Sequence, residues 1–130
     1  MKRKKIFNFF NPQNDNKNKD LGRINEDLFE KAIQNLINQK VDLIKNKKLI
    51  AYHRAEKNGD LDKFHIDFLL ILNDFTSIPI QIKSSTNGVK KHQNKYKYIF
   101  ALMINKKYSN EDIEKILISS LNWILKNRDK

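Results

Sequence analysis

The stretch from His65 to Ser85 carries three polar side chains whose types and spacing suit chemistry on a phosphate. Thirteen residues separate Asp67 from Gln81, and Lys83 follows two residues later. Carboxylate and amide oxygens are hard ligands for a divalent cation, and an ammonium group can stabilise negative charge on a phosphate. An unpaired polar group costs about 1–3 kcal/mol when buried, so three together on an apolar ribbon indicate a function.

The same stretch predicts a β-hairpin that would bring these side chains together. Two short apolar runs, Ile66–Leu72 and Ile78–Ile82, flank the turn-forming residues 73–77. Because side chains alternate between the faces of a strand, Asp67 is expected opposite Gln81 or Lys83 at the open end of the hairpin. A cross-strand ion pair between Asp67 and Lys83 with a purely structural role is the alternative interpretation.

A helix from Asn25 to about Gln39 is predicted from apolar residues that recur at three-and-four spacing. The stripe consists of Leu28, Phe29, Ala32, Ile33, Leu36 and Ile37. Glu26 and Glu30 lie on one flank of that stripe, from which a carboxylate can reach a cleft between helix and sheet. Alternatively, both glutamates only favour the dipole at the N-terminus of the helix.

Two motifs in this arrangement resemble those of the PD-(D/E)xK nuclease superfamily. Asp67 with Gln81-Ile82-Lys83 is similar to its catalytic motif, with Gln in the D/E place, and Gly22 to Glu26 is similar to its first-helix G-x-x-x-E. The resemblance covers roughly residues 22–105. It implies an α/β fold of the restriction-endonuclease-like class, with an αβββαβ core whose mixed sheet is flanked by helices, followed by a C-terminal helix.

The resemblance also implies a metal-dependent endonuclease that hydrolyses DNA, including branched or structured DNA. Asp67, the Gln81 amide oxygen, the backbone carbonyl of Ile82 and Glu26 would hold Mg²⁺ or Mn²⁺, with Glu30 as a second candidate for the glutamate. Lys83 would orient the attacking water and stabilise developing charge. Gln81 removes one negative charge from this set, so the alternative is a non-catalytic nucleic-acid-binding module or subunit with a degenerate nuclease site.

Polar and basic residues beyond Lys83 suit contacts with a phosphate backbone. They are Ser84, Ser85, Lys90, Lys91, His92, Gln93 and Lys95. His92 is also a candidate for proton transfer, although a single surface histidine usually has no such role. His65 shares a face with Asp67 and is therefore expected close to it.

The remaining elements complete the predicted order of helix, three strands, short helix, strand and helix. We expect a strand over Lys48–Ala55, a turn over Glu56–Asp60, a short helix over Val89–Lys95 and a strand over Tyr96–Ile104. A capping box at Ser109–Asp112 starts the last helix, whose apolar stripe is Ile113, Ile116, Leu117, Leu121 and Ile124. Short loops favour a meander of the first three strands, and the crossover favours a parallel fourth.

Length and charge limit the classes of protein that remain. The 130 residues suit one domain over residues 21–130, preceded by a basic, loosely ordered arm over residues 1–20. The net charge of +11 favours DNA as partner, although an AT-rich genome would also enrich Lys, Asn and Ile. The absence of cysteine excludes disulfides and favours a cytoplasmic protein. No apolar run is long enough for a transmembrane helix, and the resemblance to small junction resolvases raises the expectation of a homodimer.

Overall fold

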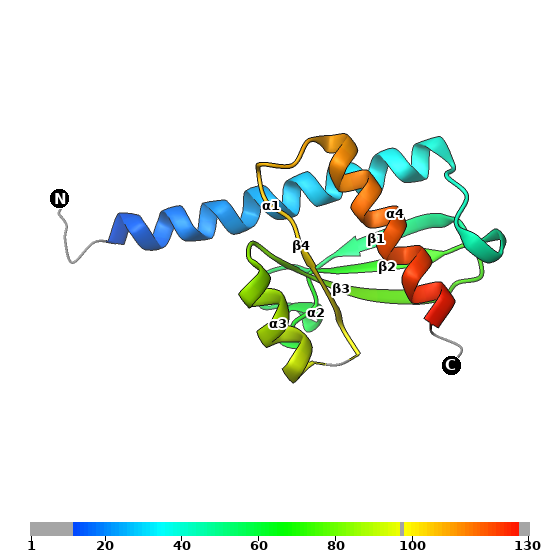
Figure 1. Ribbon diagram of the computed structural model, residues 1–130. Coiled ribbons are helices and arrows are strands. Elements are labelled where there is room, and N and C mark those ends of the chain that lie inside the picture. The colour runs from blue at the N-terminus through cyan, green and yellow to red at the C-terminus, as the bar shows by residue number, and fades with distance from the viewer. Residues whose placement is uncertain (1–11, 97, 128–130) are drawn as a thin grey trace.

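Four strands form one mixed sheet in the computed structural model, which describes residues 12–96 and 98–127, with side chains from residue 22 onward (Figure 1). The strands β1 (Leu49–Arg54), β2 (Phe68–Leu72), β3 (Ser77–Lys83) and β4 (Phe100–Met103) lie in the order β1-β2-β3-β4. The pairs β1–β2 and β2–β3 are antiparallel, and β4 is parallel to β3. The predicted meander and the predicted parallel fourth strand are both confirmed.

The register of the β2–β3 hairpin follows from its turn and its alternating pattern. Phe68 pairs with Ile80 and Ile71 with Ser77, and Asp67, one residue beyond the last pair, donates its backbone N–H to the Ile80 carbonyl. Phe75 closes the turn with a positive φ of 65°, and its N–H donates to the Leu72 carbonyl at 2.8 Å. A slip of one residue would turn every apolar side chain to the wrong face, so the buried face fixes this register.

One face of the sheet is covered by the helices α1 (Pro12–Gln39) and α4 (Asn110–Asn127), and the other by α3 (Thr86–Lys95) (Figure 1). Alternate residues of β2 and β3, from Phe68 to Ile82, are buried in a core with Phe29, Ile33 and Leu117. The rings of Phe29 and Phe68 meet edge to face at 5.1 Å between centroids. The intervening residues, including Gln81 and Lys83, lie on the α3 side.

The helix α1 begins at Pro12, well before the predicted start at Asn25. Residues 12–20, which we expected in a loosely ordered arm, are therefore helical, and α1 projects beyond the sheet (Figure 1). Residues 1–11 of that arm lie outside the described residues. Pro at the first helical position lacks only an N–H that would be unpaired there anyway, so it is compatible with this start.

Two further elements differ from the prediction. The segment Asp60–Lys63 forms a one-turn helix, α2, where we expected only the end of a turn. The strand β4 begins at Phe100 instead of Tyr96, because the chain first makes a turn in which the Ile99 N–H donates to the Tyr96 carbonyl at 3.3 Å. Residues 77–79 of β3 consequently have no β4 partner, since the first pair of the ladder is Ile80 with Phe100.

The last helix, α4, begins with the predicted capping box. The Asp112 N–H donates to Ser109 Oγ at 3.1 Å, and the Ser109 N–H donates to Asp112 Oδ2 at 3.2 Å. The buried residues of α4 include Ile113, Leu117, Leu121 and also Leu125, which lay outside the predicted stripe. In the described part of the chain, no helix is long and apolar enough to cross a membrane.

Candidate active site

Asp67 lies at the open end of the hairpin, immediately before β2. Its backbone N–H donates to the Ile80 carbonyl at 2.9 Å, and its carbonyl accepts from the Ala55 N–H at 2.8 Å. These bonds fix Asp67 between β1 and β3 although β2 starts one residue later. Its side chain is on the α3 side of the sheet, as are those of Gln81 and Lys83.

The carboxylate of Asp67 also binds the backbone of the facing strand. The Ile82 N–H donates to Asp67 Oδ2 at 2.7 Å. Because the N–H and C=O of a strand residue point to the same side, the Ile82 carbonyl is also directed toward the side on which Asp67 lies. Two of the residues predicted to act together, Asp67 and Ile82, are therefore in direct contact, and Gln81 directly precedes Ile82 in β3.

Burial is the main influence on the charge of Asp67. It raises the pKa of this carboxyl group above its ordinary value, whereas the hydrogen bond from Ile82 and the charge of Lys83 act in the opposite direction. The structure forms no salt bridge between Asp67 and Lys83, so the purely structural ion pair considered above is not present. The positive charge of Lys83 therefore affects the pKa of Asp67, although its ammonium group forms no ion pair with that carboxylate.

Gln81 and Lys83 lie under the helix α3. The Gln81 Oε1 atom is buried and has no hydrogen-bond partner among the described residues. A buried amide oxygen of this kind keeps its lone pairs available for a cation or a water molecule. A Cβ atom at Gly88 of α3 would lie 3.4 Å from the Cβ of Lys83, so the glycine allows the helix to approach this side chain closely.

Glu26 reaches this region from the opposite layer. Burial raises its pKa to about 7, and the negative charge of Asp67 contributes in the same direction, while Arg54 opposes the shift. The Arg54 Nε atom lies 3.6 Å from Glu26 Oε1. Glu26 is therefore partly protonated near neutral pH and would become a better ligand if a cation or a basic group approached it.

Glu30, the second glutamate that the sequence left open, belongs to a different set of contacts. Its Oε1 accepts from Arg54 Nη1 at 3.0 Å, and its Oε2 accepts from the Tyr52 hydroxyl at 2.7 Å. Asp27 also accepts from Arg54 Nη1, at 2.6 Å. Of the two glutamates, Glu26 is the one whose pKa responds to the charge of Asp67.

Arg54 and Asp62 also influence this region, although neither was among the predicted site residues. Arg54 joins three acidic residues of α1 to the end of β1. The negative charge of Asp62 contributes to the raised pKa of both Glu26 and Asp67. The only sequence signal for Arg54 was an arginine at the end of a predicted strand, which does not by itself indicate a partner on the helix.

The residues predicted to contact nucleic acid divide into two groups. Ser84, Ser85, Lys90, Lys91 and Lys95 are exposed, and Ser85 Oγ also caps α3 by accepting from the Gly88 N–H at 3.0 Å. Gln93 is instead directed to β4, where its Oε1 accepts from the Ala101 N–H at 3.2 Å.

His92 is buried, with 5% of its surface exposed, so the expectation of a surface histidine was wrong. Its Nε2 atom has no hydrogen-bond partner among the described residues. Burial and the charge of Lys83 both lower its pKa. His65, expected near Asp67, stacks on Tyr96 at 4.4 Å between ring centroids, and the Tyr96 ring also contacts His92 at 5.0 Å.

Within residues 12–96 and 98–127, no three His, Asp or Glu side chains lie together in a way that could hold a metal ion. The predicted oxygen donors are of mixed type, namely the carboxylates of Asp67 and Glu26, the amide oxygen of Gln81 and the carbonyl of Ile82. A comparison with protein-family models, with curated proteins and with solved structures finds no match for this chain.

Proposed function

We propose that this protein is a metal-dependent endonuclease that hydrolyses DNA phosphodiester bonds, with a core of the restriction-endonuclease-like kind. The observation that carries the proposal is the position of Asp67, Gln81 and Lys83 on one face of the sheet, at the end where β2 starts and β3 finishes. The order of elements, with β4 parallel to β3, agrees with the αβββαβ core that the resemblance implies.

The donor set is compatible with Mg²⁺ or Mn²⁺ because every atom in it is an oxygen. Asp67, Gln81 Oε1 and the Ile82 carbonyl would hold the ion, and Glu26 would join them directly or through water. Such an ion supplies charge that activates a water molecule near neutral pH and neutralises the phosphate. The buried, unpartnered Oε1 of Gln81 supports this assignment, since a buried polar atom without a partner calls for one.

Lys83 is assigned to the phosphate that is attacked. Its ammonium group would stabilise the negative charge that develops on the phosphate oxygens. The charge of Lys83 contributes to the lowered pKa of His92, and α3 approaches the stem of the lysine closely at Gly88. The exposed Lys90 and Lys91 on the same helix would bind neighbouring phosphates of the DNA.

The alternative is a non-catalytic nucleic-acid-binding module or subunit with a degenerate site. Two observations favour it: Gln81 takes the place of a second carboxylate, and Glu30 is bound to Arg54 and Tyr52. The basic surface would be shared by both functions, so binding of DNA alone does not separate them. Cleavage of DNA that requires Asp67 would distinguish the nuclease from the binding module.

The test is cleavage of four-way junction, duplex and single-stranded DNA with Mg²⁺ or Mn²⁺. We expect activity in the wild type that disappears in Asp67→Asn and in chelator. The substitution keeps an oxygen that can accept from the Ile82 N–H but removes the charge. Asp42→Asn is the matched control, because the Asp42 side chain is 78% exposed and lies far along the chain from the site. Cleavage that survives Asp67→Asn would exclude the proposed site, and binding without cleavage on all three DNAs would favour the alternative.

A further inference from the structure

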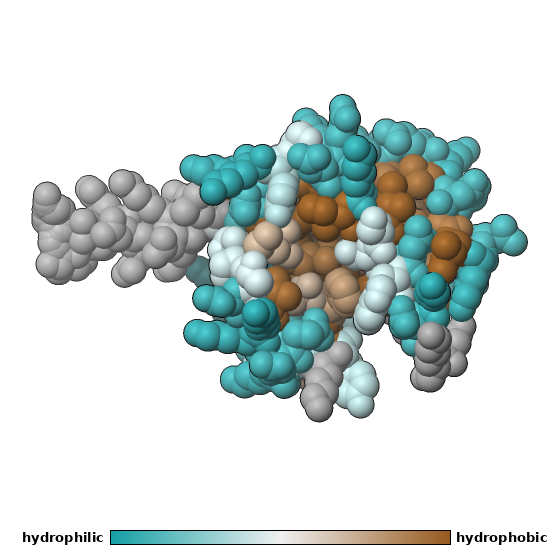
Figure 2. Space-filling view, in the orientation of Figure 1, coloured by the Kyte–Doolittle hydropathy of each residue, from teal (hydrophilic) through white to brown (hydrophobic). Residues whose placement is uncertain are grey.

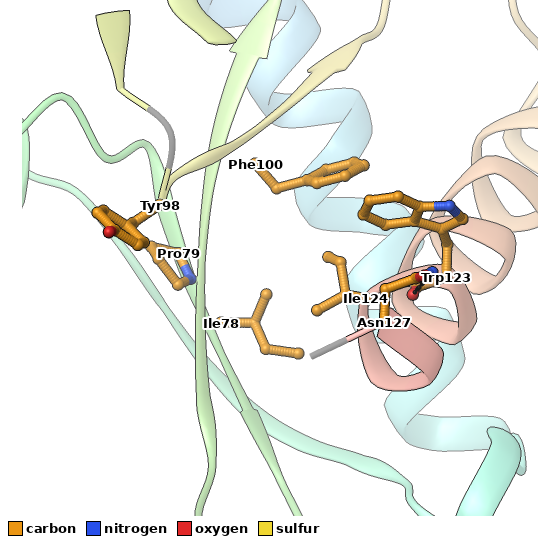
Figure 3. A pocket seen from close by; sticks show the side chains of 7 residues that line it. All are labelled: Ile78, Pro79, Tyr98, Phe100, Trp123, Ile124 and Asn127. Atoms are coloured by element: carbon orange, nitrogen blue, oxygen red, sulfur yellow. Dashed lines mark hydrogen bonds between the residues drawn. The ribbon is translucent and has the colours of Figure 1, made fainter. Parts of the chain in front are cut away.

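A second feature of the surface lies at the opposite end of β3. Because β4 starts at Phe100, residues 77–79 of β3 have no neighbouring strand, and a notch opens between this edge and α4. The notch is a cavity of about 510 Å³ lined by Ile78 and Pro79 of β3, by Tyr98 and Phe100, and by Trp123 of α4 (Figure 3). Figure 2 shows apolar side chains gathered in a hollow on this face, framed by hydrophilic surface.

The notch exposes aromatic rings that a soluble domain normally covers. Tyr98 is 95% exposed and Trp123 is 57% exposed. The ring of Trp123 lies 5.6 Å from that of Phe100, at an angle of 44°, and Figure 3 shows the two side by side. Exposed apolar patches bordered by polar surface usually mark a binding site.

The neighbouring charges are those that attract a polyanion. None of the described residues that line the notch is acidic. Tyr98 also lines a second cavity, of about 320 Å³, together with Lys95 and Tyr96. The Lys95 ammonium lies over the Tyr96 ring at 5.6 Å from its centroid. Lys126 is exposed on α4, about one helical turn after Trp123. Alternating rings and cations are the arrangement that binds single-stranded nucleic acid.

Two observations argue against a protein strand or a second copy in the notch. Pro79 has no N–H, so an added β-strand could not form a regular ladder along this edge. A second copy of the chain would bring another net charge of +11 to a surface that already carries cations.

We propose that the notch binds unpaired nucleobases of single-stranded DNA, which stack on Tyr98 and Trp123 while Lys95 binds a phosphate. This inference rests on the proposed function for the choice of DNA, and it adds that the substrate has a single-stranded part. Pro79 and Lys83 lie on the same face of β3, about 13 Å apart along the strand. A base stacked on Tyr98, which lies beside Pro79 in Figure 3, is therefore a few nucleotides away from a bond next to Lys83, whereas Trp123 lies on the α4 side of the sheet.

Trp123 is the single tryptophan of the chain, so its fluorescence reports directly on this notch. We expect a twelve-residue oligo(dT) to quench the emission and to bind about 10-fold more tightly than an abasic deoxyribose-phosphate oligomer of the same length. The titration uses the full chain carrying Asp67→Asn, so that no cleavage occurs. Equal affinity for the two oligomers, without quenching, would overturn the proposal.

A variant pair separates stacking from folding. Tyr98→Ser removes a ring that is almost fully exposed, and it should weaken oligo(dT) binding about 5- to 100-fold. Phe75→Ser is the control, because Phe75 is 80% exposed but lies at the β2–β3 turn outside the notch. The proposal fails if Tyr98→Ser binds oligo(dT) as well as the wild type does, or if both variants lose affinity equally.

The two proposals fail in different ways. Asp67-dependent cleavage of DNA with no quenching by oligo(dT) would refute base binding in the notch and leave the nuclease in place. Quenching that depends on Tyr98, with no metal-dependent cleavage, would refute the nuclease and leave base binding in the notch in place. A dimer in light scattering that Tyr98→Ser dissociates would show that a second copy occupies the notch, and would overturn the inference.

Discussion

The carboxylate of Asp67 and the backbone N–H of Ile82 are joined across the hairpin by a hydrogen bond of 2.7 Å. This bond occupies Oδ2 and continues the β2–β3 ladder by one step with a side chain in place of a backbone carbonyl. It therefore holds the residue between Gln81 and Lys83 in a fixed position relative to Asp67. A site that must place an acid, an amide and an amine around one point gains its rigidity from such a contact.

The first prediction concerns the stability of Asp67 variants. Asp67→Ala leaves the Ile82 N–H without its acceptor, which should lower the free energy of unfolding by about 1–3 kcal/mol. Asp67→Asn retains an acceptor and removes a charge whose burial is unfavourable, so it should unfold at the same urea concentration as the wild type or a higher one. Equal destabilisation by both substitutions would show that the hydrogen bond contributes nothing measurable.

The second prediction follows from the pKa of Glu26, which is raised from 4.5 to about 7. In the folded state Glu26 holds its proton at a higher pH than in the unfolded state, so stability is fully present below pH 4.5 and falls as the pH rises to 7. The shift corresponds to at most about 3 kcal/mol.

Glu26→Gln cannot titrate and should lack this loss. Urea unfolding of wild type and variant between pH 4.5 and 8 measures the difference, in which the titration of His92 cancels because both proteins contain it. We expect the variant to gain stability relative to the wild type across this range and to stay level above pH 7. Parallel curves would mean that Glu26 ionises in the folded protein as it does in the unfolded chain.

The third prediction concerns Arg54, which is 24% exposed and binds Glu26, Asp27 and Glu30. Arg54→Met leaves three carboxylates near one another without their cation, and should lower the free energy of unfolding by about 2–3 kcal/mol. Arg54→Lys should recover only part of this loss, because one ammonium cannot reproduce the guanidinium contacts.

Lys48→Met provides the comparison for Arg54. Lys48 pairs at 3.3 Å with Asp42, whose side chain is largely exposed, and the loss of such a surface pair costs less than about 1 kcal/mol. Equal effects of the two methionine substitutions on urea unfolding would show that the Arg54 cluster is no more than a surface ion pair.

The hairpin and the start of α4 could be predicted because local rules determine them. Turn residues and alternating apolar side chains fix the register of β2 against β3, which brings Asp67 to the end of β3, where it binds Ile80 and Ile82. Reciprocal bonds between Ser109 and Asp112 need only four consecutive residues. Both features depend on residues that are neighbours in sequence or across one short turn.

The features that the sequence did not reveal depend on contacts between distant segments. Arg54 gains its role only when β1 lies beside α1, and the turn over residues 96–99 delays the start of β4 to Phe100. The burial of His92 was detectable in principle, because Val89, His92, Gln93 and Tyr96 recur at helical spacing. The first turns of α1, by contrast, lie in a polar segment that has no apolar period.

The last prediction concerns Gln81, the position at which this sequence differs from the catalytic motif of the nuclease superfamily that it resembles. Gln81→Glu adds a carboxylate to the residue before Ile82, whose N–H binds Asp67, and the repulsion of the two charges should lower stability in the absence of a divalent ion. With Mg²⁺ the order should reverse, because the additional charge strengthens binding of a hard cation, by about 10-fold in affinity. Thermal unfolding at increasing Mg²⁺ concentration measures both effects, since a ligand stabilises the folded state according to its affinity. Gln81→Leu is the matched control, and its unfolding temperature should not respond to Mg²⁺. If Gln81→Glu and Gln81→Leu respond to Mg²⁺ alike, the amide oxygen of Gln81 does not face a cation, and the oxygen cluster around Asp67 is not a metal site.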